Sequence, residues 1–168
     1  MCLCYDQSMR TRPHLYLFTL EVAPMTVGAM YSPLPSHLTL ISRFWSSLPP
    51  EELSEIVKPV FHQTRPIKLI FGKAATLGPK QVAVHLVENT DELKSLHSQL
   101  CSLLNANGVK YTAPQFAGDG HKPHVSKREG DQFNVGQKQM SNAAYLIEVE
   151  IKGDDHLRLI RTKFDLQG

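Results

Sequence analysis

The chain has 168 residues, of which 42% are hydrophobic and 20% are charged, and its formal net charge is +2. This length and composition predict one globular domain over residues 1–168, with a flexible terminus at 1–12, and exclude a fibre or a disordered tail. The positive charges are scattered, which gives no case for binding extended duplex nucleic acid. No window approaches the roughly 20 apolar residues of a membrane span. We therefore expect a cytoplasmic monomer without a membrane partner.

The first part of the chain predicts two strands followed by a helix. Residues 14–22 are rich in aromatic and branched side chains and are too short for a typical helix. A proline-rich loop separates them from a second strand at 37–42. Pro50 suits the first turn of a helix over 49–63, which Pro59 is expected to kink or end.

The middle of the chain predicts a hairpin and a second helix. Residues 66–71 and 81–87 are strand candidates, and the stretch between them, GKAATLGPK, predicts a long hairpin loop. The clearest helix follows, with Thr90 as its N-cap, leucines at helical spacing and Gly108 as its terminator.

The last part of the chain predicts three more strands. Residues 122–129 form a short one, the Gly- and Gln-rich stretch after it has no periodicity, and 144–152 and 157–164 form a final hairpin. Strands outnumber helices and pair as hairpins, which favours an α+β fold of mainly antiparallel sheets with helices outside. Similar elements in each half of the chain predict two lobes around a central cleft.

Two motifs repeat one design, a histidine followed two positions later by a hydroxyl residue. They are His37-x-Thr39 in PSHLTL and His124-x-Ser126 in KPHVSK, 87 residues apart. Residues two apart in a strand point to the same side, so each motif presents its imidazole and its hydroxyl together. Such groups suit phosphate-ester chemistry, in which one histidine acts as base, the other as acid, and the hydroxyls donate hydrogen bonds to phosphate oxygens. This scheme requires no metal.

These residues resemble the hallmark of the two-histidine (2H) phosphoesterases, which include bacterial 2'-5' RNA ligase-like proteins and cyclic nucleotide phosphodiesterases. The paired motifs, their spacing and the proline before His124 match, and the resemblance covers roughly His14 to Phe164. It implies that His37 and His124 are the catalytic acid and base, without a fixed assignment between them, and that Thr39 and Ser126 bind phosphate.

The resemblance also implies a reaction class. It is hydrolysis of 2',3'-cyclic phosphate or 2'-5' phosphodiester bonds, or the reverse ligation, on a nucleotide or an RNA end, with no cofactor. The alternative is a catalytically weak RNA- or nucleotide-binding module on the same fold. Both motifs are complete in this chain, which favours the enzyme.

Two features differ from the usual family pattern. The segment 23–36 is short and broken by prolines where family members carry a full helix, so we expect a remodelled or more open rim of the cleft. Lys127 stands where an apolar residue is usual, so the strand ends there or Lys127 reaches solvent past the apolar face.

Other candidate residues follow from position alone. Arg43 and Arg128 lie an even number of positions after His37 and His124 respectively. If the strands continue, each arginine points to the same side as its histidine, so both are candidates to bind the phosphate. His121, three residues before His124 and near Asp119, allows a metal site as an alternative, but no further ligands are placed.

Several aromatic and histidine side chains have less specific interpretations. Five aromatic residues near the motifs suit either base stacking or core packing: Tyr31, Phe44, Trp45, Phe116 and Phe133. The remaining histidines are expected to be structural or surface residues: His14, His62, His85, His97 and His156. Cys2, Cys4 and Cys101 make an odd count without a zinc-finger partner pair, so we expect neither a disulfide framework nor a metal site from them.

Overall fold

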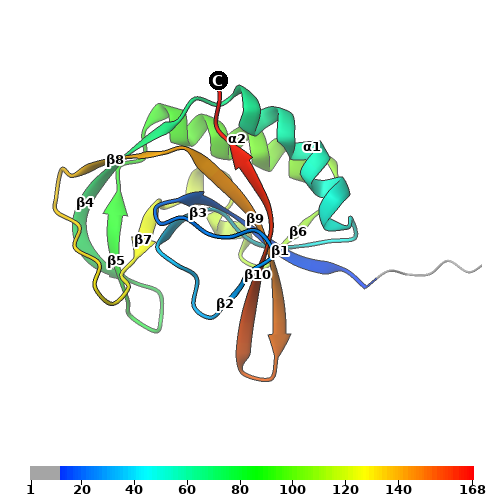
Figure 1. Cartoon of the computed structure of the whole chain (residues 1–168), viewed down its shortest axis with the longest axis horizontal. Coiled ribbons are helices and arrows are strands. Elements are labelled where there is room, and N and C mark those ends of the chain that lie inside the picture. The colour runs from blue at the N-terminus through cyan, green and yellow to red at the C-terminus, as the bar shows by residue number, and fades with distance from the viewer. Residues whose placement is uncertain (1–11) are drawn as a thin grey trace, which may run out of the picture.

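The computed structural model describes residues 12–168, so the predictions for the terminus before Arg12 and for the Cys2-x-Cys4 pair lie outside the described residues. A ten-stranded sheet forms the body of the structure (Figure 1). The strand pairs are antiparallel, and two helices cover one side of the sheet. The predicted α+β class is therefore confirmed.

The described elements are two helices, two short 3-10 turns and ten strands. The helices are α1 (Pro50–Gln63) and α2 (Asp91–Ala106), with short 3-10 turns at Pro114–Phe116 and Gly118–Gly120. The strands are β1 (His14–Glu21), β2 (Met30–Tyr31), β3 (His37–Ser46), β4 (Ile67–Leu77), β5 (Val82–Val87), β6 (Lys110–Tyr111), β7 (His124–Ser126), β8 (Lys138–Ser141), β9 (Ala143–Lys152) and β10 (Asp155–Asp165). In the sheet they lie in the order β2-β10-β9-β1-β3-β7-β5-β4-β8, with β6 beside β3.

Both helices begin where their sequence signals predict. Pro50 opens α1, where its missing N–H leaves no hydrogen bond unmade, and the side chain of Thr90 accepts a hydrogen bond from the Leu93 N–H at the start of α2. Pro59 does not end α1, because Val57 and Phe61 are fully buried and hold the last turn in the core. No helix within residues 12–168 is long and apolar enough to cross a membrane.

Several strands differ from the sequence-based predictions, and the two-residue strands β2 and β6 were not predicted. β4 continues to Leu77, so the long loop predicted after Phe71 shrinks to a tight turn, with positive φ at Gly78 and Gln81. β8 lies in the stretch that showed no periodicity. β7 is only three residues long and ends at Ser126, so Lys127 lies beyond it and needs no path past an apolar face.

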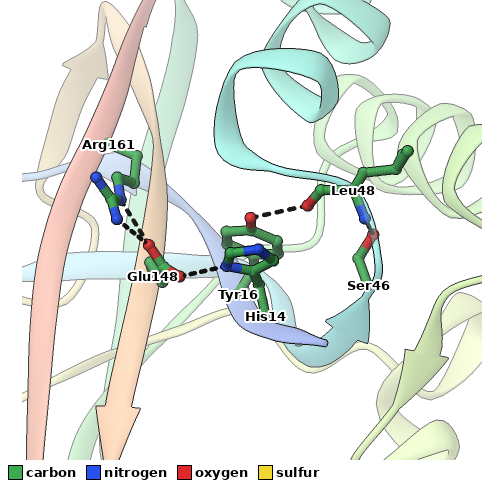
Figure 2. A network of polar contacts seen from close by, with 6 residues as sticks. All are labelled: His14, Tyr16, Ser46, Leu48, Glu148 and Arg161. Atoms are coloured by element: carbon green, nitrogen blue, oxygen red, sulfur yellow. Dashed lines mark hydrogen bonds and ion pairs between the residues drawn. The ribbon is translucent and has the colours of Figure 1, made fainter. Parts of the chain in front are cut away.

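A polar network joins the first strand to the final hairpin, as Figure 2 shows. The Glu148 carboxylate accepts hydrogen bonds from His14 Nδ1 at 2.7 Å and from Arg161 Nε at 2.6 Å. Beside it, the Tyr16 hydroxyl donates to the Leu48 carbonyl at 2.9 Å. These contacts anchor β1 between β9 and β3, and β3 carries the first histidine motif.

Candidate active site

The two histidine motifs lie side by side where β3 pairs with β7 in the middle of the sheet. Leu38 of β3 pairs with Val125 of β7, and both side chains are fully buried. Because the strands are antiparallel, this register sets His37 opposite Ser126 and Thr39 opposite His124. Residues flanking a buried strand position point to the other face. The two paired strands therefore present both imidazoles and both hydroxyls on one face of the sheet.

Each histidine is held by its own backbone in the same way. The carbonyl oxygens of Pro35 and Lys122 lie 2.7 Å from Nδ1 of His37 and of His124 respectively. A carbonyl oxygen only accepts hydrogen bonds, so Nδ1 carries the proton in both rings. Nε2 is consequently the nitrogen left to exchange a proton with a ligand on either histidine.

Two cavities adjoin at the motifs. A cavity of about 260 Å³ is lined by His37, and one of about 400 Å³ is lined by His124. Thr39, Ser42 and Ser126 line both, so the hydroxyl groups lie at the boundary between them. A phosphate at that boundary would have one histidine on each side.

The two cavities differ in chemistry. The larger one has apolar walls from the β4–β5 hairpin and the 3-10 turn, formed by Leu77, Val82, Val84 and Phe116. The smaller one is lined by three arginines, Arg43, Arg128 and Arg158. A nucleotide fits this division, since its base suits the apolar walls and its phosphates suit the arginines.

The environment of His37 favours the neutral imidazole. Burial, with smaller contributions from the positive charges of Arg128 and Arg158, lowers the pKa of His37 to about 4. The hydrogen bond to the Pro35 carbonyl opposes this shift only in part. At neutral pH His37 can therefore accept a proton at Nε2.

Arg43 and Arg128 both line the cavity beside His37, but the regular alternation from which they were predicted is interrupted in β3 and stops before Arg128 in β7. The β1–β3 register shifts near Leu17 and again near Leu40, so β3 does not alternate regularly. Ile41, which shares the parity of His37, is buried, whereas Ser42 and Arg43 both reach the cavity. Arg128 arrives from the loop after β7, because that strand ends at Ser126.

A carboxylate joins the two motif segments. Asp131 Oδ2 accepts a hydrogen bond from the Ser36 hydroxyl at 2.6 Å and from the Arg128 N–H at 2.9 Å. Ser36 immediately precedes His37, so this single side chain ties the first motif to the loop that follows the second. Sequence reasoning did not identify Asp131, because the contact joins residues 95 positions apart.

Two further histidines contact the backbone of β3, and one of them, His121, also lines the larger cavity. His97 of α2 is buried; its Nδ1 lies 2.8 Å from the Leu40 carbonyl, and its Nε2 accepts from the Gly118 N–H at 2.9 Å. His121 stacks on His97 at 4.1 Å between centroids, and its Nε2 lies 3.2 Å from the Thr39 carbonyl. These rings thus bind the backbone carbonyls of Leu40 and of Thr39 itself. Within residues 12–168, no three His, Cys, Asp or Glu side chains gather as a metal site.

Phe116 is the one of the five aromatic candidates that lines the larger cavity, where it is 45% exposed. Phe44 is fully buried in the core, and Phe133 stacks on Phe71 at 4.3 Å. Tyr31 pairs with Arg158 in the β2–β10 ladder, and Trp45 lines a separate surface hollow with Arg12 and Arg161. No local sequence signal separates Phe116 from the others.

Arg158, Ser42 and Lys122 also line the two cavities but were not predicted from sequence. Arg158 lies on a predicted strand, three residues before Arg161, and the local pattern does not distinguish the two. Only the tertiary fold directs Arg158 to the cavity and Arg161 to Glu148.

Solved structures share this fold. The crystal structure of a phosphoesterase superimposes with a TM-score of 0.66 at 14% identity, covering 93% of this chain and 99% of that one. E. coli LigT complexed with 3'-AMP gives 0.65 at 14% identity, covering 93% and 99%, and TT0787 of Thermus thermophilus gives 0.57 at 16%, covering 92% and 98%. At such identities the likeness establishes the fold.

The family is established by sequence. No curated protein matches the chain. The sequence profile of the 2'-5' RNA ligase superfamily, however, matches residues 4–161, which include both histidine motifs and the strands and helices between them. The chain therefore belongs to the 2'-5' RNA ligase superfamily, within the two-histidine phosphoesterases.

Proposed function

We propose that this protein is a metal-independent phosphoesterase that acts on 2',3'-cyclic phosphates or 2'-5' linkages of nucleotides or RNA ends. The observation that carries the proposal is the Leu38–Val125 pair, which brings both His-x-(Thr/Ser) motifs to one face. Each histidine bonds its own backbone through Nδ1, which leaves its Nε2 for the substrate. LigT has been solved with 3'-AMP and with ATP, which agrees with a nucleotide ligand on this fold.

In the proposed hydrolysis, His37 is the base and His124 is the acid. Neutral His37 takes a proton from the attacking water at Nε2, because its pKa of about 4 leaves it unprotonated near pH 7. The water oxygen bonds to phosphorus, and the P–O bond to the ribose breaks. His124, which in this scheme enters the step protonated on both ring nitrogens, donates its Nε2 proton to the departing ribose oxygen. Ligation is the same path in reverse with the roles exchanged.

The remaining predicted residues bind phosphate groups of the substrate in this scheme. The hydroxyls of Thr39 and Ser126 donate hydrogen bonds to the non-bridging oxygens as their charge is redistributed. Arg43 and Arg128 supply positive charge from the cavity beside His37. The base of the nucleotide occupies the apolar cavity, against the exposed ring of Phe116.

The test is turnover in EDTA. Nucleoside 2',3'-cyclic phosphates and 2'-5' linked dinucleotides are incubated with the protein, and the products are followed by phosphorus NMR, which also identifies the oxygen that leaves. We expect His37→Gln and His124→Gln each to lower kcat by about 10²- to 10⁴-fold. His62→Gln on α1, away from both cavities, is the matched control and should retain full activity.

Three results would contradict the proposal. They are no turnover of either substrate, full activity in both histidine variants, and turnover that disappears on chelation. Binding of the nucleotides without turnover would favour the alternative of a binding module.

A further inference from the structure

Three arginines from distant parts of the chain meet in the cavity beside His37. Arg43 lies on β3, Arg128 follows β7 and Arg158 lies on β10, and all three are half-buried in the wall of one space of about 260 Å³. Burial lowers the pKa of Arg158, and the positive charges of Arg43 and Arg128 lower it further, so the three groups are close enough to repel one another.

No carboxylate within residues 12–168 forms an ion pair with any of these three arginines. Arg161 provides the contrast on the same strand as Arg158, because it binds the Glu148 carboxylate at 2.5 Å. Half-buried guanidinium groups are normally paired, since an uncompensated charge loses hydration without gaining a partner. Three uncompensated groups in one cavity therefore indicate an anionic ligand.

Backbone carbonyls hold two of the guanidinium groups in place. Arg128 Nε donates to the Leu34 carbonyl at 2.9 Å, and Arg158 Nη1 donates to the His156 carbonyl at 2.7 Å. Each bond uses one N–H of a group that has five, so several donors remain for a ligand. Such preorganised guanidinium groups match the oxygen atoms of a phosphate.

The number and position of these charges exceed what the reacting phosphate needs. A phosphodiester or cyclic phosphate carries one negative charge, whereas the cavity holds three positive ones. The hydroxyls of Thr39 and Ser126 lie at the boundary of both cavities, but the arginines line the smaller cavity alone. The arginine donors therefore lie on the His37 side of that boundary.

We propose that Arg43, Arg128 and Arg158 bind a second phosphate group of the substrate, next to the phosphate that reacts. This inference rests on the proposed function and narrows its substrate class. The favoured substrate is a nucleotide or RNA end with a further phosphate beside the cyclic or 2'-5' phosphate. Arg158 is then a specificity-determining residue that touches the substrate away from the reacting atoms.

Binding of unreactive nucleotides tests the inference without turnover. Calorimetry compares adenosine 3'-monophosphate with adenosine 3',5'-bisphosphate on the full chain at fixed ionic strength. A dinucleotide with a 3'-phosphate is the third probe, and it distinguishes an internucleotide phosphate from a terminal one. We expect the bisphosphate, the dinucleotide or both to bind roughly tenfold more tightly than the monophosphate, with an advantage that shrinks as salt is added.

Arg158→Gln should remove nearly all of that advantage, so that the probes with a second phosphate bind about as tightly as the monophosphate. The affinity for the monophosphate should stay close to that of the unaltered chain. The matched control is Arg65→Gln, which removes the same charge from an exposed position after α1 and should leave the ratio unchanged. Equal binding of all three probes by the unaltered chain would overturn the inference. So would an advantage that persists in Arg158→Gln or is lost equally in Arg65→Gln.

The inference and the proposed function fail in different ways. If cyclic phosphates are turned over but a second phosphate brings no advantage, the inference is wrong and the phosphoesterase stands. If a second phosphate strengthens binding through Arg158 but neither substrate class is turned over, the subsite stands and the proposed reaction is wrong.

Discussion

His37 and His124 make the same contact with their own backbone: Nδ1 of each donates to the carbonyl oxygen two residues earlier, at 2.7 Å in both cases. The rings are thus equivalent in tautomer and differ in surroundings, because His37 lies beside arginines and His124 lies beside apolar walls. We infer that these surroundings divide the base and acid roles between two otherwise matched groups.

The first prediction concerns the pH dependence of turnover. Burial and the neighbouring positive charges lower the pKa of His37 to about 4, so the neutral base predominates above that pH. In a plot of kcat/KM for a cyclic phosphate against pH, the midpoint of the acidic limb should therefore lie near pH 4. This is well below the value of about 6.5 for an ordinary histidine. Circular dichroism at each pH verifies that the protein remains folded.

Arg158→Gln should move this limb to higher pH, because it removes one charge that disfavours the protonated His37 ring. Arg65→Gln should leave the limb in place. A limb at the ordinary histidine value of about 6.5 in the unaltered protein would argue against His37 as the base.

The second prediction concerns Asp131, which links Ser36 to the Arg128 backbone. Asp131→Asn weakens two charge-assisted hydrogen bonds and frees the two motif segments to shift relative to each other. We expect kcat/KM to fall by about tenfold while the far-UV spectrum is unchanged. Asp154→Asn, at the exposed turn of the β9–β10 hairpin, is the control and should behave like the unaltered chain. Unchanged kinetics in Asp131→Asn would mean that the link does not position the site.

The third prediction concerns His97, which is 3% exposed and bonds the Leu40 carbonyl and the Gly118 N–H. His97→Gln cannot reproduce both contacts from α2, so a buried backbone group loses its partner. The free energy of unfolding should fall by about 2 kcal/mol, measured by urea denaturation. His62→Gln near the end of α1 should cost much less, and equal losses in the two variants would refute a specific role for His97.

The fourth prediction concerns the Glu148 network. Burial alone would raise the pKa of Glu148, but hydrogen bonds from His14 and Arg161 outweigh it and hold the pKa below its ordinary value of 4.5. A carboxylate with a lowered folded-state pKa stabilises the protein above its unfolded-state pKa, and that stabilisation is lost as pH falls through the folded value. Glu148→Gln should therefore lower the free energy of unfolding at pH 7 by about 1–2 kcal/mol.

The difference between Glu148→Gln and the unaltered chain should shrink as the pH is lowered below about 4.5. Urea denaturation at several pH values measures it. Glu150→Gln is the matched control, since that carboxylate is 52% exposed and its ion pair with Lys152 is a surface contact. A pH-independent cost of Glu148→Gln would show that its charge is not the source of the stabilisation.

Much of the local structure could be predicted because its causes are local. Pro50 and Thr90 open their helices through contacts made within one turn. The alternation of the two motifs places imidazole and hydroxyl together on any extended strand. Local signals were misleading where packing prevails: Val57 and Phe61 keep α1 helical beyond Pro59, and cross-strand pairing extends β4 through the stretch expected to be a loop.

The amino-acid sequence alone is enough to identify the two histidine motifs, the α+β class and the family to which the motifs point. It does not contain, in any local pattern, the pairing of Leu38 with Val125, the irregular alternation that brings both Ser42 and Arg43 to the cavity, or the arrival of Arg158 beside them. Those features come from the folded chain. Hydrogen bonding and side-chain alternation within a strand depend on neighbouring residues, whereas cross-strand register and the meeting of distant charges depend on how the whole core packs.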